Sequence, residues 1–424
     1  MCAGLLPATL CAQTAEPAQK ENEFSTSVQI RSRAEYRNGA LNPRSEGESP
    51  AGFVNERARV AMDYKRPDLQ VHLSAQHVGV WGQDPQIDKN GRFALNEAWA
   101  QYAFGDGFFA RLGRQALAYD DERLLGALDW NVAGRSHDAL KLGYEKGVNK
   151  LHLILAFNQN DERTIGGAYY ATGAQPYKNM QTAWYHYTGS DNLFQASLLF
   201  MNLGWETGDA EKARTRYMQT MGTYLTYKPG DWTVNGTLYF QTGKNKAARN
   251  VSAWMAAVAA AFKLNPAWTF KAGADYLSGD DGTSATSHAF DPLYGTHHKF
   301  YGAMDYFYAS AWKQGAPGLV DATVGASWQV SAPVGLSFNY HYFSTAKSMT
   351  REGAPDRIRR GLGSEFDAQL TWKIKKDVQL TAGYSIMRGT RSMDFYKGGD
   401  HTCWQDWGWV SLNINPRVFF AKWK

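Results

Sequence analysis

In the stretch WTFKAGADY, residues 268–276, every second side chain is apolar. The apolar side chains would share one face of an extended strand and the others the opposite face: Trp268, Phe270, Ala272, Ala274 and Tyr276 against Thr269, Lys271, Gly273 and Asp275. A two-residue period over about ten residues is typical of a tilted strand that crosses a bilayer. We therefore expect one face of this strand to meet lipid and the other to meet water.

The same alternation recurs in residues 320–330 (VDATVGASWQV) and 365–374 (EFDAQLTWKI), and it dominates the chain from Ser27 onward. The Ala-rich segment around Met255 favours a helix by propensity. However, it falls between a long loop and the Asn265-Pro266 turn, where a strand is due. We expect a strand there as well.

Eight short turns rich in Gly, Pro, Asn or Asp punctuate the alternating segments. They lie at residues 65–68, 105–107, 146–149, 189–192, 229–231, 265–266, 332–335 and 375–377. Longer polar loops separate them, for example residues 38–51, 116–134, 158–178 and 278–317. Eight turns join sixteen strands, and one strand at each chain end makes eighteen. The pattern predicts an all-β fold, a transmembrane antiparallel β-barrel with short periplasmic turns and long extracellular loops.

Composition excludes a helical membrane protein, because the longest apolar run, residues 254–262, is less than half of a spanning helix. Aromatic residues make up 14% of the chain and cluster beside the short turns, as in an interfacial girdle. They are Tyr64, Phe104, Phe108, Tyr144, Tyr227, Trp232, Phe262, Trp268, Trp328 and Trp372. The alternative is the ordinary preference of strands for aromatics. A net charge of +5 without a polybasic run gives no sign of nucleic-acid binding.

The segment MCAGLLPATLCAQ at the start resembles the apolar core and cleavage end of a secretory signal. We assign residues 1–12 to a signal-peptide remnant, residues 13–23 to a flexible N-terminal segment and residues 24–424 to a single barrel domain. A lipid-attachment site at Cys11 is the weaker alternative. After cleavage only Cys403 remains, so no intramolecular disulfide can form.

Face parity places a set of basic side chains inside the barrel, all on the first ten strands: Arg31, Arg33, Arg57, Arg59, Arg111, Arg135, Lys141 and Arg216. Inward carboxylates come later, at Asp275, Asp321, Glu365 and Asp367. A barrel this wide should hold water, which keeps inward charges hydrated. One hypothesis is that the basic arc selects anionic or polyhydroxylated solutes through its guanidinium groups. The other is that these charges form cross-strand ion pairs, such as Arg33 with Glu35 or Arg59 near Asp63, and select nothing.

Two further stretches carry a family resemblance. Residues 110–115 (ARLGRQ), 120–123 (DDER), 129–131 (DWN) and 134–139 (GRSHDA) resemble a segment of the alginate-export family of outer-membrane porins. Residues 290–300 (FDPLYGTHHKF) and 304–307 (MDYF) are similar to a second segment of that family. The resemblance implies an eighteen-stranded barrel with an electropositive lumen that conducts an acidic polysaccharide or a related solute. By position in the first motif, it also implies a constriction, or loops supporting one, that includes Arg111, Arg114, Asp120, Asp121, Arg123 and Arg135.

The segment 278–317 is far longer than a usual structureless connection. Its many aromatic rings could not all stay solvated, so we expect it to fold over or into the mouth as a lid. The residues assigned to that lid are Tyr294, His297, Lys299 and Asp305. An external loop that packs on its neighbours without gating is the alternative.

No grouping of residues predicts an enzyme, a cofactor or a metal site. His297-His298 and the Asp280-Asp281-Gly282 turn lack ligand spacing, and no nucleophile elbow or phosphate loop occurs. The sequence predicts a passive channel in the outer membrane of a Gram-negative bacterium, for export or diffusion of anionic or sugar-like solutes. Its expected partners are outer-membrane lipid and lipopolysaccharide, the solute and periplasmic export components. A nutrient-uptake porin is the first alternative; a barrel enzyme and an adhesin are the others.

Overall fold

The computed structural model describes residues 21–87, 92–159, 162, 164–165, 176–208, 212–350 and 357–424. The signal segment assigned to residues 1–12 lies outside the described residues, as do residues 13–20. The first strand begins at Asn22, so Asn22 and Glu23 belong to the barrel rather than to a flexible segment. Glu23 pairs with Lys65 on one side and with Lys422 on the other, which holds the start of the strand in the sheet.

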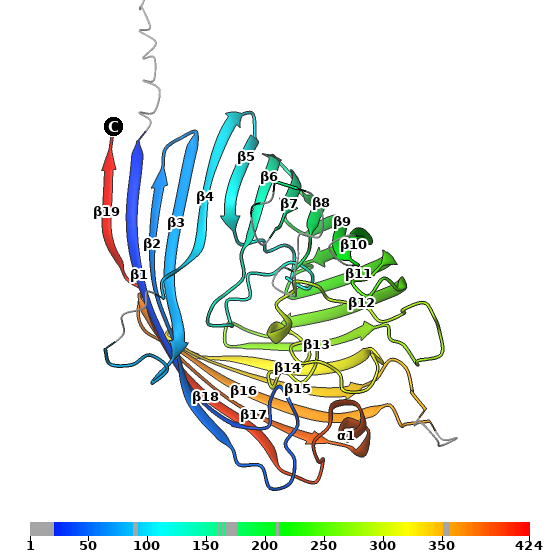
Figure 1. Ribbon diagram of the computed structural model, residues 1–424. Coiled ribbons are helices and arrows are strands. Elements are labelled where there is room, and N and C mark those ends of the chain that lie inside the picture. Colours follow the sequence, from blue (N-terminus) through cyan, green and yellow to red (C-terminus); the bar gives the residue numbers. More distant parts are fainter. Residues whose placement is uncertain are drawn as a thin grey trace, which may run out of the picture.

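The regular secondary structure of the described residues is nearly all strand, in one continuous antiparallel sheet (Figure 1). The strands are β1 Asn22–Asn38, β2 Ala51–Lys65, β3 Leu69–Val80, β4 Ala94–Gly105, β5 Phe108–Gln115, β6 His137–Lys146, β7 Asn149–Phe157, β8 Asn179–Thr188, β9 Phe194–Thr207, β10 Arg214–Tyr227, β11 Trp232–Lys244, β12 Asn250–Lys263, β13 Trp268–Leu277, β14 Leu319–Ser331, β15 Val334–Ser344, β16 Gly361–Lys375, β17 Val378–Gly389, β18 Gln405–Ile414 and β19 Arg417–Trp423. Two short helices, η1 His297–Lys299 and α1 Arg391–Lys397, lie in the connections. No helix among the described residues is long and apolar enough to cross a membrane.

The sheet closes on itself because β1 pairs with β2 along one edge and with β18 and β19 along the other. Residues Ile30–Asn38 of β1 face β18, and residues Asn22–Ser27 face β19. Pro416, which has no backbone N–H to donate, interrupts the ladder between them. Because β18 and β19 are two pieces of one last strand, nineteen segments form a barrel of eighteen strands. Figure 1 shows the C-terminal end of β19 beside the start of β1.

All eight predicted turns are confirmed as hairpin connections. The strand predicted around Met255 is confirmed as β12, which pairs with β11 and β13 over nearly its whole length. In a membrane-spanning barrel, backbone groups in this position must be hydrogen-bonded to neighbouring strands. The place of this segment between a long loop and a hairpin turn therefore outweighs the helix propensity of its alanines.

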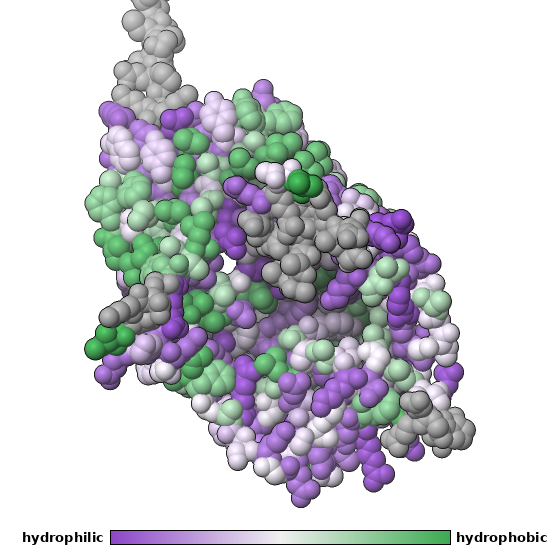
Figure 2. All heavy atoms as spheres, in the orientation of Figure 1, coloured by the Kyte–Doolittle hydropathy of each residue, from purple (hydrophilic) through white to green (hydrophobic). Residues whose placement is uncertain are grey.

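The outward face carries the apolar side chains, as the alternation predicts. Phe270, Val324 and Phe366 are exposed, whereas Asp321 and Glu365 on the same strands are buried inside the barrel. Figure 2 shows an apolar band across the outer surface of β1–β3 and a deep hollow at the centre of the barrel. Rings next to the short turns meet across strands, with Trp268 stacked on Trp328 at 5.3 Å and Trp232 4.8 Å from Phe262. These contacts fit an interfacial girdle.

Candidate functional site

Loop A, the connection between β5 and β6 (residues 116–136), turns into the barrel and is anchored there by Arg123. The Arg123 guanidinium binds both carboxylate oxygens of Asp275 on β13, at 2.8 and 3.0 Å, and Asp121 at 2.8 Å. Although burial opposes the charge, the carboxylate of Asp275, the hydroxyl of Tyr301 and the carboxylate of Asp121 raise the pKa of Arg123 above its usual range. This buried fork ties loop A to the far wall of the barrel.

A second anchor of loop A is Asp120. Its carboxylate accepts hydrogen bonds from Trp184 Nε1 on β8 at 3.0 Å and from Ser197 Oγ on β9 at 2.6 Å. Burial raises the pKa of Asp120, although both donors favour its ionised form. Asp120, Asp121 and Arg123 therefore support the loop rather than forming a row of charges in water.

Loop B, the connection between β13 and β14 (residues 278–318), lies on loop A inside the barrel. Leu125 and Tyr294 form a parallel bridge, and Thr296 Oγ1 donates to Glu122 at 2.6 Å. Arg135 donates to the carbonyl oxygens of Tyr294 and Gly295. The two family-like segments of the sequence are thus packed against each other.

The later half of loop B is held by the wall of β16 and β18. The backbone N–H of Met304 donates to Glu365 at 2.8 Å, and the Tyr306 hydroxyl donates to Gln405 at 2.7 Å. Tyr301 and Phe307 are also fully buried, so the rings of this loop avoid water by entering the barrel. Of the residues assigned to a lid, Tyr294, His297, Lys299 and Asp305 all lie in this inserted loop; that the loop gates remains a prediction.

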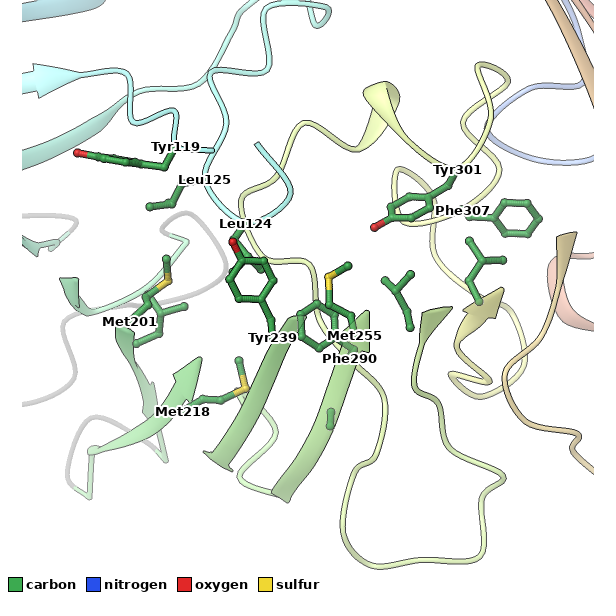
Figure 3. Packing of buried hydrophobic residues seen from close by; sticks show 14 of the residues in the cluster. Tyr119, Leu124, Leu125, Met201, Met218, Tyr239, Met255, Phe290, Tyr301 and Phe307 are labelled. Carbon is green, nitrogen blue, oxygen red and sulfur yellow. The ribbon is translucent and has the colours of Figure 1, made fainter. Parts of the chain in front are cut away.

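An apolar cluster fills the space between these loops and the strand wall (Figure 3). Met201, Met218, Tyr239 and Met255 project inward from β9, β10, β11 and β12 and meet residues of both loops, including Leu124 and Phe290. This corrects the expectation of a water-filled interior lined by charge. The inward positions of these strands face a folded loop, so burying an apolar side chain there is favourable.

A water-accessible cavity of about 610 Å³ remains between the loops and the wall of β15–β18 and β1. The loop side contributes Glu122, Asp129, Trp130, His298 and Lys299, with Arg31 and Arg33 from β1 beside them. Apart from His341 and Asp367, the opposite wall is polar and uncharged: Ser337, Asn339, Gln369, Gln379, Thr381, Ser385, Ser411 and Asn413. Trp130 is fixed between Arg33, 4.0 Å above its ring, and His298, stacked at 4.0 Å.

The predicted basic residues of β1 and β2 do gather on one side of the interior. Arg31 and Arg57 share the carboxylate of Asp129, at 3.2 and 2.6 Å. Arg33 and Arg37 share Glu35, both at 2.8 Å. The ion pair expected between Arg33 and Glu35 thus forms, although it runs along β1 rather than across strands.

Arg59 has a different partner from the one considered in the sequence. It binds Gln76 and Asn96, while Asp63 pairs with His72. The hydrogen-bond partners of Arg59 in the described residues are thus neutral amides, and none of these residues forms an ion pair with it.

Arg111 and Lys141 extend the basic side on β5 and β6. Arg111 donates to Gln101 at 2.9 Å and stacks over Trp99, and Lys141 lies 5.9 Å from the Phe109 ring. Arg216 on β10 has the same parity as the buried, inward Met218. The selective role of these residues remains a prediction.

Arg114 does not line the lumen. It alternates with the inward Arg111 and Gly113, shares the outward face with the exposed Leu112, and pairs with Asp138 on the outside of β6 at 3.1 Å. The family motif placed Arg114 near the constriction, but the two-residue period of β5 turns it to the outer face.

The inward carboxylates are largely occupied by protein contacts. Asp275 binds Arg123, Glu365 accepts from the backbone of loop B, and Asp321 contacts His341 Nδ1 at 2.9 Å. His341 Nε2 lies 3.6 Å from Asp367. Of this acidic arc, Asp367 still lines the cavity opposite Arg31 and Arg33.

The histidine and aspartate signals of the long loop have structural partners. His297 Nδ1 contacts the carbonyl oxygen of Tyr308 at 3.1 Å, and His298 contacts Asp305 at 2.8 Å. Asp280 accepts from the backbone N–H of His288 at 2.6 Å. These side chains order the loop.

The family model described as Alginate export matches residues 24–390. This chain belongs to the alginate-export family. No curated protein matches it.

Solved structures show the same barrel as this alginate-export family member. OpdK of Pseudomonas aeruginosa, solved with vanillate, is 11% identical, with a TM-score of 0.59 over 94% of this chain and 99% of OpdK. OccK2 (OpdF) of the same organism, in complex with glucuronate, is 11% identical, with a TM-score of 0.58 over 93% and 98% of the two chains. A BenF-like porin from Pseudomonas fluorescens is 12% identical, with a TM-score of 0.58 over 93% and 99%. Together with the family match, these likenesses identify a multi-pass outer-membrane β-barrel.

Sequence reasoning missed the uncharged wall of this alginate-export barrel. Asn339, Gln369 and Gln379 have inward parity, but the prediction of selectivity rests on charged residues alone. Asp129 was also not assigned a role, although it neutralises two arginines. The position of Asp129 in the Asp129-Trp130 pair of the first family-like segment could have pointed to such a role.

Proposed function

We propose that this protein is a passive outer-membrane channel for anionic solutes that carry hydroxyl groups, such as acidic saccharides. The carrying observation is the group of interior arginines on β1 and β2 beside a cavity whose β15–β18 wall carries mostly uncharged hydrogen-bonding groups, with Asp367 as its one carboxylate. Such a lumen can attract a carboxylate without trapping the solute, as conduction requires.

The surplus follows from the ion pairs. The four arginines at positions 31, 33, 37 and 57 share two carboxylates, Asp129 and Glu35, and Arg59 binds neither, which leaves three positive charges in excess within this group. Asp129 is itself exposed, with 65% of its side chain accessible, so its pairing is screened by water. Excess charge inside low-dielectric walls raises the local concentration of anions.

The uncharged wall suits hydroxyl groups. Asn339, Gln369 and Gln379 line the cavity, and none of them makes a side-chain hydrogen bond within the described residues. Each amide offers both donors and an acceptor, the complement of a sugar hydroxyl. The neighbours solved with glucuronate and with vanillate offer a parallel, since both of those compounds are carboxylates.

Reversal potentials in planar bilayers under a salt gradient test the proposal. The wild-type channel should prefer anions, and Arg59→Gln should lower the preference because it removes a charge that no carboxylate balances. Arg114→Gln is the matched control, since it removes a guanidinium from the outer face. A cation-preferring wild-type channel, or equal effects of the two variants, contradicts the proposal.

The narrowing by loops A and B also favours small solutes, so nutrient uptake is the second candidate. A pore carries no direction, and the solute gradient alone sets the flow. Liposome swelling with mono-, di- and oligosaccharide acids separates the two uses. Swelling that stops at the disaccharide supports uptake, whereas continued permeation of longer acids supports export, in which periplasmic export components would take part.

A further inference from the structure

A large groove lies on the outer surface of the barrel, away from the lumen. It encloses about 1570 Å³ at the external ends of β15, β16 and β17 and is bordered by the start of α1 and by residues 401–404. The strands reach this end through Ser344, Gly361 and Gly389, opposite to their short turns. The groove therefore lies where the barrel meets the external leaflet.

Three arginines line this groove: Arg359, Arg388 and Arg391. All three are exposed, and none forms an ion pair or a side-chain hydrogen bond within the part of the chain that the structure describes. Among the described residues, no carboxylate lines the groove, and the lining His401 is held by Asp394 at 2.5 Å. Three unbalanced guanidinium groups at one place repel one another, so an anionic occupant is favourable.

The rest of the groove is aromatic. Tyr340, Tyr342, Phe366 and Trp404 line it, and each keeps 39% or more of its surface exposed. The Tyr340 hydroxyl donates to Ser364 at 2.8 Å, which leaves the ring face free. Exposed rings next to cations can bind a ligand that carries both a negative charge and sugar or acyl groups, because the rings contact the sugar or acyl groups.

The position of Arg388 along β17 indicates which anionic ligand the groove binds. On the outward face of β17, Arg388 comes two residues after Ile386 and four after Tyr384, at the external margin of the apolar band. A lipid phosphate lies at that depth, directly above the hydrocarbon. We propose that the groove binds the phosphate groups of a lipopolysaccharide molecule in the external leaflet, with the guanidinium groups as phosphate ligands and the aromatic floor against its glucosamine and acyl chains.

Binding of labelled lipid A to the full-length protein in detergent tests this site. Wild-type protein should bind bisphosphorylated lipid A more tightly than lipid A stripped of phosphate. Arg388→Gln should weaken binding about tenfold, because each charge-assisted hydrogen bond is worth at least that factor. The triple variant with Arg359→Gln and Arg391→Gln should lose phosphate discrimination altogether.

Lys246→Gln is the control, since Lys246 is an exposed cation in the distant connection between β11 and β12. It should bind as wild type does, and heat-modifiable migration on gels should show that every variant retains the barrel. The reversal potential should not change in the triple variant, which separates this site from the lumen. Wild-type affinity in the triple variant, equal binding of phosphate-free lipid A, or an equal loss in Lys246→Gln overturns the proposal.

Discussion

The guanidinium of Arg123 holds loop A inside the barrel. The Arg123 side chain is 7% exposed and that of Asp275 is 13% exposed, so Arg123→Gln would leave a carboxylate buried without its cation. We expect this variant to lose about 3 kcal/mol of stability, the usual cost of breaking a buried pair from one side. Urea unfolding followed by tryptophan fluorescence measures the change.

The double variant Arg123→Gln with Asp275→Asn is the matched control. Neither charge then stays buried alone, so part of the lost stability should return. If the single variant unfolds at the wild-type urea concentration, Arg123 is not the anchor.

Lys397 should make the stability of the protein depend on pH. Its ammonium in α1 donates to Ser310 Oγ at 2.8 Å and to the carbonyl oxygen of Ala311 at 2.7 Å. Burial, with Lys313 nearby, lowers the pKa of Lys397 to about 8. In the unfolded chain the pKa is about 10.4, so the unfolded state binds more protons between these values.

The contribution of Lys397 is therefore unfavourable below pH 8, and the free energy of unfolding should rise between about pH 8 and pH 10.4, by up to about 3 kcal/mol. Unfolding in urea at several pH values measures this slope. Lys397→Met should remove this part of the slope. An identical slope in both proteins rules out Lys397 as its source.

The absence of a side chain at Gly302 lets loop B pack closely against Glu365 in the barrel wall. Gly302 has φ of +87°, and a Cβ there would lie 2.7 Å from the Glu365 carboxylate. Gly302→Ala should therefore displace the loop and raise the single-channel conductance, since the narrowest part widens. Gly282→Ala is the control: its φ is +84°, but the nearest atom to its Cβ is Met349 Cε at 3.8 Å.

Both alanine variants carry backbone strain of about 1 kcal/mol or more, because positive φ disfavours a side chain. Only Gly302→Ala adds the clash with Glu365. Equal conductance in the two variants would show that loop B does not narrow the pore.

At this scale the strands and turns could be predicted, but the seating of the loops could not. Membrane crossing imposes a two-residue period on each strand, which is a local signal, so even the Ala-rich β12 could be found. The contacts that seat the loops join distant positions: Arg123 with Asp275, and Tyr306 with Gln405. No local pattern in a single sequence indicates which carboxylate an arginine will reach.

Eighteen strands alone would leave a wide pore, and two folded loops with their apolar cluster fill much of it and leave a cavity beside β15–β18. Under the proposed function, the loops would set the size limit, and the arginines of β1 and β2 would set the preference for anions. Parity placed those arginines correctly in the interior, but it could not show that Asp129 of loop A would balance two of them.

A selectivity that arises from surplus charge spread over one wall should weaken with salt. The Debye length falls from about 10 Å at 0.1 M to about 3 Å at 1 M, so in concentrated salt each guanidinium acts only on ions that touch it. We expect the anion preference of the wild-type channel to fall between 0.1 M and 1 M KCl, as measured by reversal potentials at a fixed ratio across the bilayer. In Arg59→Gln the anion preference should already be reduced at 0.1 M KCl and should change less with salt. In Arg114→Gln it should have the same value and the same salt dependence as in the wild type. A preference that stays constant over this range would instead indicate one tight anion site that excludes screening ions.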